Sequence, residues 1–169
     1  MQTTLGRKGD YSVRAVLNIT RNEGDRQKTR EIAAAMDIPE RYLTQILASL
    51  VAQGILTATA GPNGGYVLAK VPEDISLLEV VEAAEGPIAL DECVLKGGRC
   101  EWDEICPIHV PWARAQNAFM GQLASTSFAD LQIASVEIAA GEFEVPLDTP
   151  PHSLPPERRR PDPQGRLSG

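Results

Sequence analysis

The spacing of apolar residues in the first third of the chain predicts three helices. Apolar positions recur on one helical face in residues 9–21, and residues 29–36 form a second, shorter helical segment with Thr29 as its expected N-cap. The most regular pattern, with apolar residues at i, i+3, i+4 and i+7, covers residues 43–50, and Gly54 ends this third helix. A short turn separates the second helix from the third.

Two short segments, 55–59 and 66–69, flank the glycine-rich stretch 60–65, which is the signature of a β-hairpin. Three helices followed by a hairpin wing, with a short turn before the third helix, make a winged helix-turn-helix. We therefore expect a mainly α-helical protein with a small β-wing.

The second half of the chain predicts three more helices. Ser76 and Glu79 form a capping box ahead of an apolar segment that ends at Gly86. A long helix is expected from Pro111, because proline suits the first turn of a helix, and a shorter one follows it through residue 138. The long helix carries an apolar stripe that needs a partner, formed by Trp112, Ala115, Phe119 and Leu123.

These patterns divide the chain into four parts. We expect a DNA-binding domain at 1–72, a linker helix and loop at 73–110, the long helix and a C-terminal helix at 111–140, and a tail at 141–169. Seven of the 13 prolines lie in residues 146–163. This density, with few large apolar residues, predicts a disordered tail.

Charge is distributed unevenly along the chain. The net charge of -7 divides into +3 for residues 1–72, -12 for 73–150 and +2 for 151–169, so the predicted DNA-binding domain can face phosphates while the acidic part is held away from them. No apolar run reaches the roughly 18 residues of a membrane helix, and the first residues contain no apolar signal segment. We therefore expect a cytoplasmic protein without membrane partners.

The start of the third helix carries the side chains best suited to contact bases, because glutamine pairs with adenine and arginine with guanine or phosphate. These candidates are Glu40, Arg41, Thr44 and Gln45. In the wing, backbone N–H groups can approach phosphates closely at Gly61, Asn63 and Gly64. The candidate phosphate contacts are Arg7, Lys8, Arg14, Lys28 and Arg30. A solvated helix face and an ordinary tight turn are the alternative interpretations.

All 3 cysteines and one of the 2 histidines follow the pattern Cys93-x6-Cys100-x5-Cys106-x2-His109. Thiolate and imidazole ligands suit iron-sulfur clusters or zinc. Zinc sites are usually built from closely spaced C-x2-4-C pairs, so these wider spacings favour an iron-sulfur cluster.

Other hypotheses for these residues are open at this point. A zinc ion would stabilise the loop, and a disulfide between Cys93 and Cys100 would make a thiol switch without a cofactor. A nucleophilic pair of Cys106 and His109 would make a thiol enzyme, although no third, orienting group is evident. Acidic residues surround the cysteines, which argues against a purely apolar, buried role.

Four motifs together make the chain similar to the winged-helix bacterial regulators of the IscR and NsrR family. The resemblance covers about residues 5–131 and is closest to the IscR type. Its motifs are GDYSVRA at 9–15, YLTQI at 42–46, GPNGGY at 61–66, and the cysteine segment with KGGRC at 96–100 and CPIH at 106–109.

This resemblance implies a transcriptional regulator rather than an enzyme, and a repressor. It would bind palindromic promoter DNA as a homodimer joined through the helix that starts near Pro111, with Tyr42 among the DNA-contacting residues. Occupancy or redox state of an iron-sulfur cluster would set its DNA affinity. Two DNA-contacting positions depart from the IscR type, with Thr44 in place of an acidic residue and Ala60 in place of an arginine.

The resemblance also implies two sets of cluster ligands. In the IscR type, the positions that match Cys93, Cys100, Cys106 and His109 hold a 2Fe-2S cluster, which is the favoured expectation here. In the NsrR type, the fourth ligand comes from the first helix of the partner subunit. Asp10 occupies that position in this chain, and its use would imply a 4Fe-4S cluster.

Overall fold

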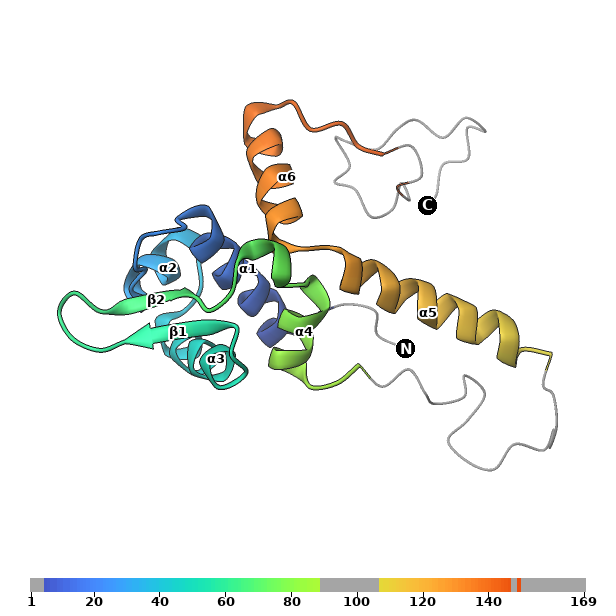
Figure 1. The fold of residues 1–169 in the computed structure, drawn as a ribbon, viewed down its shortest axis with the longest axis horizontal. Helices are drawn as coiled ribbons and strands as arrows, with labels where there is room; N and C mark the ends of the chain where they lie inside the picture. The colour runs from blue at the N-terminus through green and yellow to red at the C-terminus, as the bar shows by residue number, and fades with distance from the viewer. Residues whose placement is uncertain (1–4, 89–106, 147–148, 150–169) are drawn as a thin grey trace, which may run out of the picture. The chain divides into compact units, whose positions relative to one another are not determined.

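The computed structural model describes residues 5–88, 107–146 and 149. In that part of the chain it has six α-helices and a two-stranded antiparallel sheet, in the order that the sequence predicts, and a short 3-10 helix that the sequence does not predict (Figure 1). The chain divides into two compact units, Met1–Ser135 and Val136–Gly169. None of the helices in the described ranges has the length and apolar composition needed to span a bilayer.

Three helices build the helix-turn-helix: α1 (Arg7–Arg21), α2 (Thr29–Met36) and α3 (Glu40–Ala52). Their apolar faces meet in one core, where Ile19, Ile32 and Leu47 are fully buried. Asp37 adopts the left-handed conformation at a φ of 52° and turns the chain from α2 toward α3. The periodicity of the sequence therefore identifies all three helices.

The N-terminus of α2 differs from the prediction. Thr29 is the first helical residue, and Lys28 is the N-cap. The backbone N–H of Lys28 donates to Oε2 of Glu31 at 2.8 Å. A glutamate at the third helical position thus satisfies the N–H of the cap residue, which is the bond that the glutamate of a capping box makes.

The wing consists of β1 (Leu56–Thr59) and β2 (Gly65–Leu68), which pair antiparallel with Leu56 opposite Leu68. The connection between α1 and α2 adds an isolated bridge to β2. Gln27 N donates to the Tyr66 carbonyl at 3.0 Å, and Tyr66 N donates to the Gln27 carbonyl at 2.9 Å. A Cβ at Gly65 would lie 2.8 Å from the Gln27 carbonyl oxygen, so this close approach requires glycine.

After the wing, a 3-10 helix (Pro72–Asp74) leads into α4 (Leu77–Glu85). Ser76 caps α4 as predicted, because its Oγ accepts from the backbone N–H of Glu79 at 3.1 Å. The Glu79 carboxylate instead accepts from Nζ of Lys70 at 2.6 Å. Of the two bonds of the predicted capping box, the one accepted by the serine is therefore present. The glutamate instead joins α4 to Lys70 at the end of the wing.

A second carboxylate on α4 binds the N-terminus of α1. Oε1 of Glu85 accepts from the backbone N–H of Gly9 at 2.8 Å. A Cβ at Gly6 would lie 2.5 Å from that oxygen and a Cβ at Gly9 2.9 Å from it, so the two glycines make room for the carboxylate. An anion at a helix N-terminus is stabilised by the helix dipole.

We expect Glu85→Ala to lower the free energy of unfolding by about 0.5–2 kcal/mol, the usual range for loss of a capping side chain. Glu85→Gln keeps an acceptor but loses the charge, so we expect a loss of about 0.3–1 kcal/mol. Glu73→Gln, which removes an exposed carboxylate from the 3-10 helix, is the control. Urea unfolding measures the free energy of unfolding of all three variants. An unchanged unfolding midpoint for Glu85→Ala would contradict the capping role.

The long helix α5 (His109–Ser125) begins two residues before the predicted Pro111. Pro111 is the third helical residue, where the backbone N–H still lacks an intrahelical acceptor, so the proline is tolerated there. No residue of α5 is buried, and Val110 and Phe119 are 47% and 42% exposed. In the predicted stripe, Trp112 and Leu123 are half-buried, whereas Ala115 is exposed like Phe119.

The last helix, α6 (Phe128–Ala140), is joined to the core at its start. Phe128 is fully buried, and its backbone N–H donates to the Ile75 carbonyl at 2.9 Å. Leu77 N donates to the Thr126 carbonyl at 2.8 Å, so a short bridge pairs the residues before α4 with those before α6. The junction between α5 and α6 is fixed by these bonds.

A reciprocal cap begins α6. The hydroxyl and the backbone N–H of Ser127 donate to Oδ2 of Asp130 at 2.7 and 2.9 Å, and Asp130 N donates to Ser127 Oγ at 3.1 Å. The bond from the Ser127 hydroxyl lowers the pKa of Asp130 most, and the bond from the Ser127 backbone N–H lowers it further, so this pKa lies below its ordinary value. The stabilisation from this cap is therefore complete at any pH above the ordinary pKa of aspartate. It is lost as the pH falls through the lowered pKa and the carboxylate becomes protonated.

The second unit begins with the last residues of α6, and Gly141 ends the helix in the left-handed region at a φ of 76°. Val136 and Ile138 are 57% and 48% exposed. Most of the predicted proline-rich tail, residues 147–148 and 150–169, lies outside the described residues.

Candidate DNA-binding surface and cysteine segment

The first half of α3 separates buried apolar residues from exposed polar ones. Leu43, Ile46, Leu47 and Leu50 are buried in the core. All five predicted DNA contacts on this helix are exposed: Glu40, Arg41, Tyr42, Thr44 and Gln45. In a helix-turn-helix the second helix enters the major groove, so this face has the composition that base contacts need.

Contacts within α3 hold the side chains of Arg41 and Thr44 in place. The guanidinium carbon of Arg41 lies 5.0 Å from the centre of the Tyr42 ring, and Nη2 donates to the Tyr42 hydroxyl at 3.1 Å. Thr44 donates its hydroxyl to the Glu40 carbonyl at 3.1 Å. Cation-π stacking holds the guanidinium on an exposed aromatic ring, which favours a defined orientation before DNA binds.

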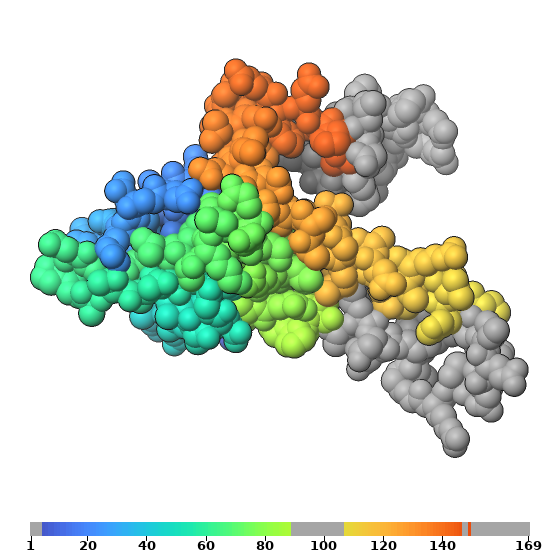
Figure 2. Space-filling model, viewed as in Figure 1, coloured from blue at the N-terminus to red at the C-terminus, as the bar shows by residue number. Residues whose placement is uncertain are grey.

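Two of the three predicted wing residues are exposed, Gly61 and Asn63, whereas Gly64 is buried. Gly64 N donates to the Gly61 carbonyl at 2.9 Å. A Cβ at Gly64 would lie 2.1 Å from the Thr59 carbonyl oxygen, so the closure of the hairpin itself requires glycine there. Gly61 and Asn63 are thus the tip residues open to a phosphate, and the wing lies at the edge of the domain in Figure 2.

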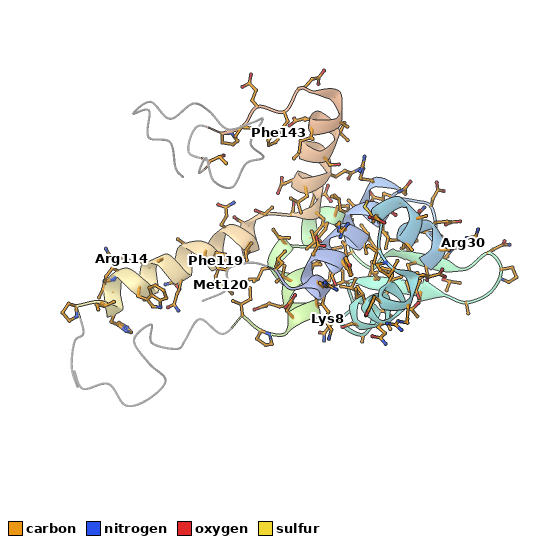
Figure 3. The ribbon with its side chains drawn as sticks, turned by 180° about the vertical axis from the view of Figure 1, so that it is seen from behind. Lys8, Arg30, Arg114, Phe119, Met120 and Phe143 are labelled. Carbon is orange, nitrogen blue, oxygen red and sulfur yellow. The ribbon has the colours of Figure 1, made fainter. Side chains whose placement is uncertain are left out.

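Four of the predicted phosphate contacts are exposed cations: Arg7, Lys8, Lys28 and Arg30. Figure 3 labels Lys8 on α1 and Arg30 on α2, in the same domain as the wing. Arg7 and Lys8 line a hollow of about 330 Å³ together with Tyr42 and Gln45 of α3. The N-terminus of α1 and the proposed base-contacting face of α3 therefore belong to one surface.

Arg14, also predicted to contact phosphate, uses its guanidinium inside the domain. Nη2 donates to Oδ2 of Asp10 at 2.6 Å, and Nη1 donates to the Met36 carbonyl at the end of α2 at 2.8 Å. The guanidinium carbon also lies 5.1 Å from the centre of the Tyr11 ring. Arg14 thus joins α1 to α2, and we do not retain it as a phosphate contact.

The predicted ligands Cys93, Cys100 and Cys106 lie outside the described residues, and His109 is the first residue of α5. Among the described residues, no group of three or more His, Cys, Asp or Glu side chains could hold a metal ion. His109 is exposed and lies three positions after Cys106 in the sequence, so a fully extended chain limits their Cα distance to about 11 Å. An accessible imidazole this close along the chain fits the proposed donor set.

Sequence reasoning missed two side chains that position this surface. Arg26 in the connection between α1 and α2 donates through Nη1 to Oγ1 of Thr59 on β1. Glu85 binds α1 next to Arg7 and Lys8. Both pairs join residues far apart in the chain, so no local pattern indicates them. The lack of charged residues in 55–69 is the one sequence feature that could have prompted a search for a cation elsewhere in the chain.

These elements define a winged-helix DNA-binding protein with a cysteine-rich segment between its fourth and fifth helices. The family model of Rrf2, described as iron-dependent transcriptional regulators, matches residues 5–133. The chain belongs to this family, which confirms the predicted fold class and the resemblance found in the sequence.

Curated relatives and solved structures agree with this assignment. IscR of Escherichia coli K12, named as an HTH-type transcriptional regulator, is 30% identical over 128 residues, which are 75% of this chain and 78% of that protein. CymR of B. subtilis, named the global cysteine regulator, has a TM-score of 0.67 and 26% identity over 78% of this chain and 98% of its own. IscR of T. potens has the same fold, with a TM-score of 0.65 and 24% identity over 86% of this chain and 96% of its own.

The protein is therefore a transcriptional regulator of the Rrf2 family, like IscR. Its relatives are regulators and not enzymes, so the hypothesis of a Cys/His thiol enzyme is not supported.

Proposed function

We propose that this regulator is an iron-sulfur-dependent repressor that binds palindromic promoter DNA as a homodimer in the cytoplasm. One combination of features carries the proposal: an exposed polar face on α3 beside a wing, and, in the same chain, a set of three cysteines and a histidine. The first can bind DNA, and the second can bind a cofactor. Occupancy or redox state of the cofactor then sets the DNA affinity, through contacts that differ between two conformations of the dimer.

The ligands that we propose are Cys93, Cys100, Cys106 and His109, holding a 2Fe-2S cluster. When bound, the cluster supplies a centre that responds to oxidants and to iron supply. The alternative fourth ligand, Asp10 of the partner subunit, would imply a 4Fe-4S cluster. Asp10 already pairs with Arg14 at 2.6 Å within its own helix, whereas His109 is exposed beside the cysteine segment, and this contrast favours His109.

The homodimer is supported by the exposure of apolar side chains on α5. A long helix with no buried residue, and with Val110 and Phe119 nearly half exposed, leaves an apolar face that association would cover. Two-fold symmetry would present two α3 helices to two DNA half-sites, which is why we propose a palindromic site.

A cofactor-free thiol switch is the second candidate, and a zinc-stabilised DNA-binding protein the third. The thiol switch is favoured by the three cysteines, two of which could form a disulfide. In this alternative, oxidation would join two cysteines and change the DNA affinity without any metal.

Anaerobic purification distinguishes these candidates. We expect coloured protein that contains iron and acid-labile sulfide, with two of each per subunit for a 2Fe-2S cluster. Colourless protein with one zinc per subunit would overturn the iron-sulfur proposal in favour of a structural metal. Colourless, metal-free protein whose DNA affinity changes on oxidation alone would favour the thiol switch.

A further inference from the structure

The wing has no charged residue of its own. Residues 55–69, which include both strands and the tip, contain no Lys, Arg, Asp or Glu. Affinity for the DNA backbone comes mainly from Lys and Arg that neutralise phosphates. A wing that lies along the backbone therefore needs a cation from another part of the chain.

The connection between α1 and α2 brings a cation to this place. Gln27 exchanges two backbone hydrogen bonds with Tyr66 of β2, at 3.0 and 2.9 Å. Gly65 permits the approach, because a Cβ there would lie 2.8 Å from the Gln27 carbonyl oxygen and 3.3 Å from the Cβ of Arg26. These backbone contacts fix the position of Arg26 beside the wing.

The side chain of Arg26 then reaches across to β1. Its Nη1 donates to Oγ1 of Thr59, the last residue of β1 before the tip, and both residues are exposed. The ion pairs of the described residues join Arg14 to Asp10 and Lys70 to Glu79, and Arg26 has no such partner among them. A guanidinium carries five N–H donors, so one bond to Thr59 leaves others for a phosphate.

We propose that Arg26 is the phosphate contact of the wing and that Thr59 is the residue that positions it. This proposal rests on the proposed binding of DNA and specifies how the wing takes part in it. A backbone contact adds affinity without sequence preference. Arg26 therefore strengthens binding to any duplex, whereas α3 supplies the choice among sequences.

A salt series on four variants tests the proposal. The probes are a 30-base-pair duplex enriched from a random pool by the wild-type protein and a duplex of the same length that was not enriched. Fluorescence anisotropy measures the affinity of the anaerobically purified full chain for each. The variants are Arg26→Gln, Thr59→Val, the double variant, and Arg21→Gln, at an exposed arginine in the last turn of α1, as a matched control outside the wing. Thermal unfolding verifies that each variant is folded.

We expect Arg26→Gln to weaken binding to both duplexes by about threefold to tenfold and to lower the log-log salt slope by about 0.9 per bound subunit. Thr59→Val should weaken binding less, and the double variant should bind no more weakly than Arg26→Gln alone, because both changes remove the same interaction. Arg21→Gln should match the wild type.

An unchanged affinity and salt slope for Arg26→Gln would overturn the proposal, as would a loss confined to the enriched duplex, which would make Arg26 a base contact. Additive effects of the two single variants would overturn the positioning role of Thr59. These results differ from a failure of the proposed function itself, in which the wild-type protein binds neither duplex and no enriched sequence is obtained.

Discussion

Replacing any one of Cys93, Cys100 and Cys106 with serine is expected to reduce the iron and acid-labile sulfide of the anaerobically purified protein to near background. Serine keeps the size of the side chain but loses the soft thiolate that binds iron. Iron and sulfide analysis with visible absorption spectra measures the effect. Because the cysteines lie between α4 and α5 and outside the DNA-binding domain, we expect each variant to remain folded.

The histidine variants identify the fourth ligand. His109→Ala should strongly reduce cluster content or change the absorption spectrum, whereas His152→Ala, at the other histidine of the chain, is the matched control and should behave like the wild type. If His109→Ala retains a normal cluster and Asp10→Ala loses it, the ligand is Asp10 of the partner subunit. Full retention of iron and sulfide in all three cysteine variants would contradict the proposed ligand set.

Arg41→Ala and Gln45→Ala are each expected to weaken binding to the enriched duplex by about 1–3 kcal/mol, which corresponds to about 5-fold to 150-fold in affinity. Both side chains are exposed at the start of α3, and the Arg41 guanidinium is ordered by the Tyr42 ring. A base contact is lost only where the correct base is present, so affinity for a non-enriched duplex should change much less.

Gln53→Ala is the matched control for these variants, because Gln53 is an exposed glutamine at the opposite end of α3. We expect it to bind both duplexes as the wild type does. Equal weakening on enriched and non-enriched DNA by Arg41→Ala or Gln45→Ala would reassign that side chain to phosphate contact.

Local sequence patterns predicted the helices well because those patterns arise within single elements. The buried side chains of α3 are the apolar residues that the periodicity identified, and Ser76 caps α4 as its spacing from Glu79 indicates. Two helix starts differ from the prediction, those of α2 and α5, because several residue types suit the first turn of a helix. Pro111 suits the third position of α5 as well as the first.

Contacts between distant residues left no local signal. Glu85 and Gly9 are 76 positions apart, and Arg26 and Thr59 are 33 apart. Neither pair can be found from periodicity, which describes only neighbours along one element. The same limit applies to Arg14, because its charge alone could not distinguish a phosphate contact from its observed bonds to Asp10 and Met36.

The exposure of the candidate residues on α3 could be predicted from the sequence, whereas the conformation of the wing could not. Exposure of Arg41, Thr44 and Gln45 follows directly from the burial of the apolar face of α3. The role of Gly64 differs from the expectation, since the hairpin backbone uses its N–H and excludes a Cβ. A glycine required by a turn and a glycine required by a ligand look alike in a sequence.

The central claim is that the cofactor of the cysteine segment controls the affinity of α3 and the wing for DNA. Its most direct test is the affinity of one anaerobic preparation for the enriched duplex, measured before and after removal of iron and again after the cluster is rebuilt. We predict that the DNA affinities of the cluster-loaded and cluster-free forms differ by about 5-fold to 150-fold, the usual range of allosteric coupling. Rebuilding the cluster should restore the affinity measured before iron was removed. Equal affinities of the cluster-loaded and cluster-free forms would contradict the account.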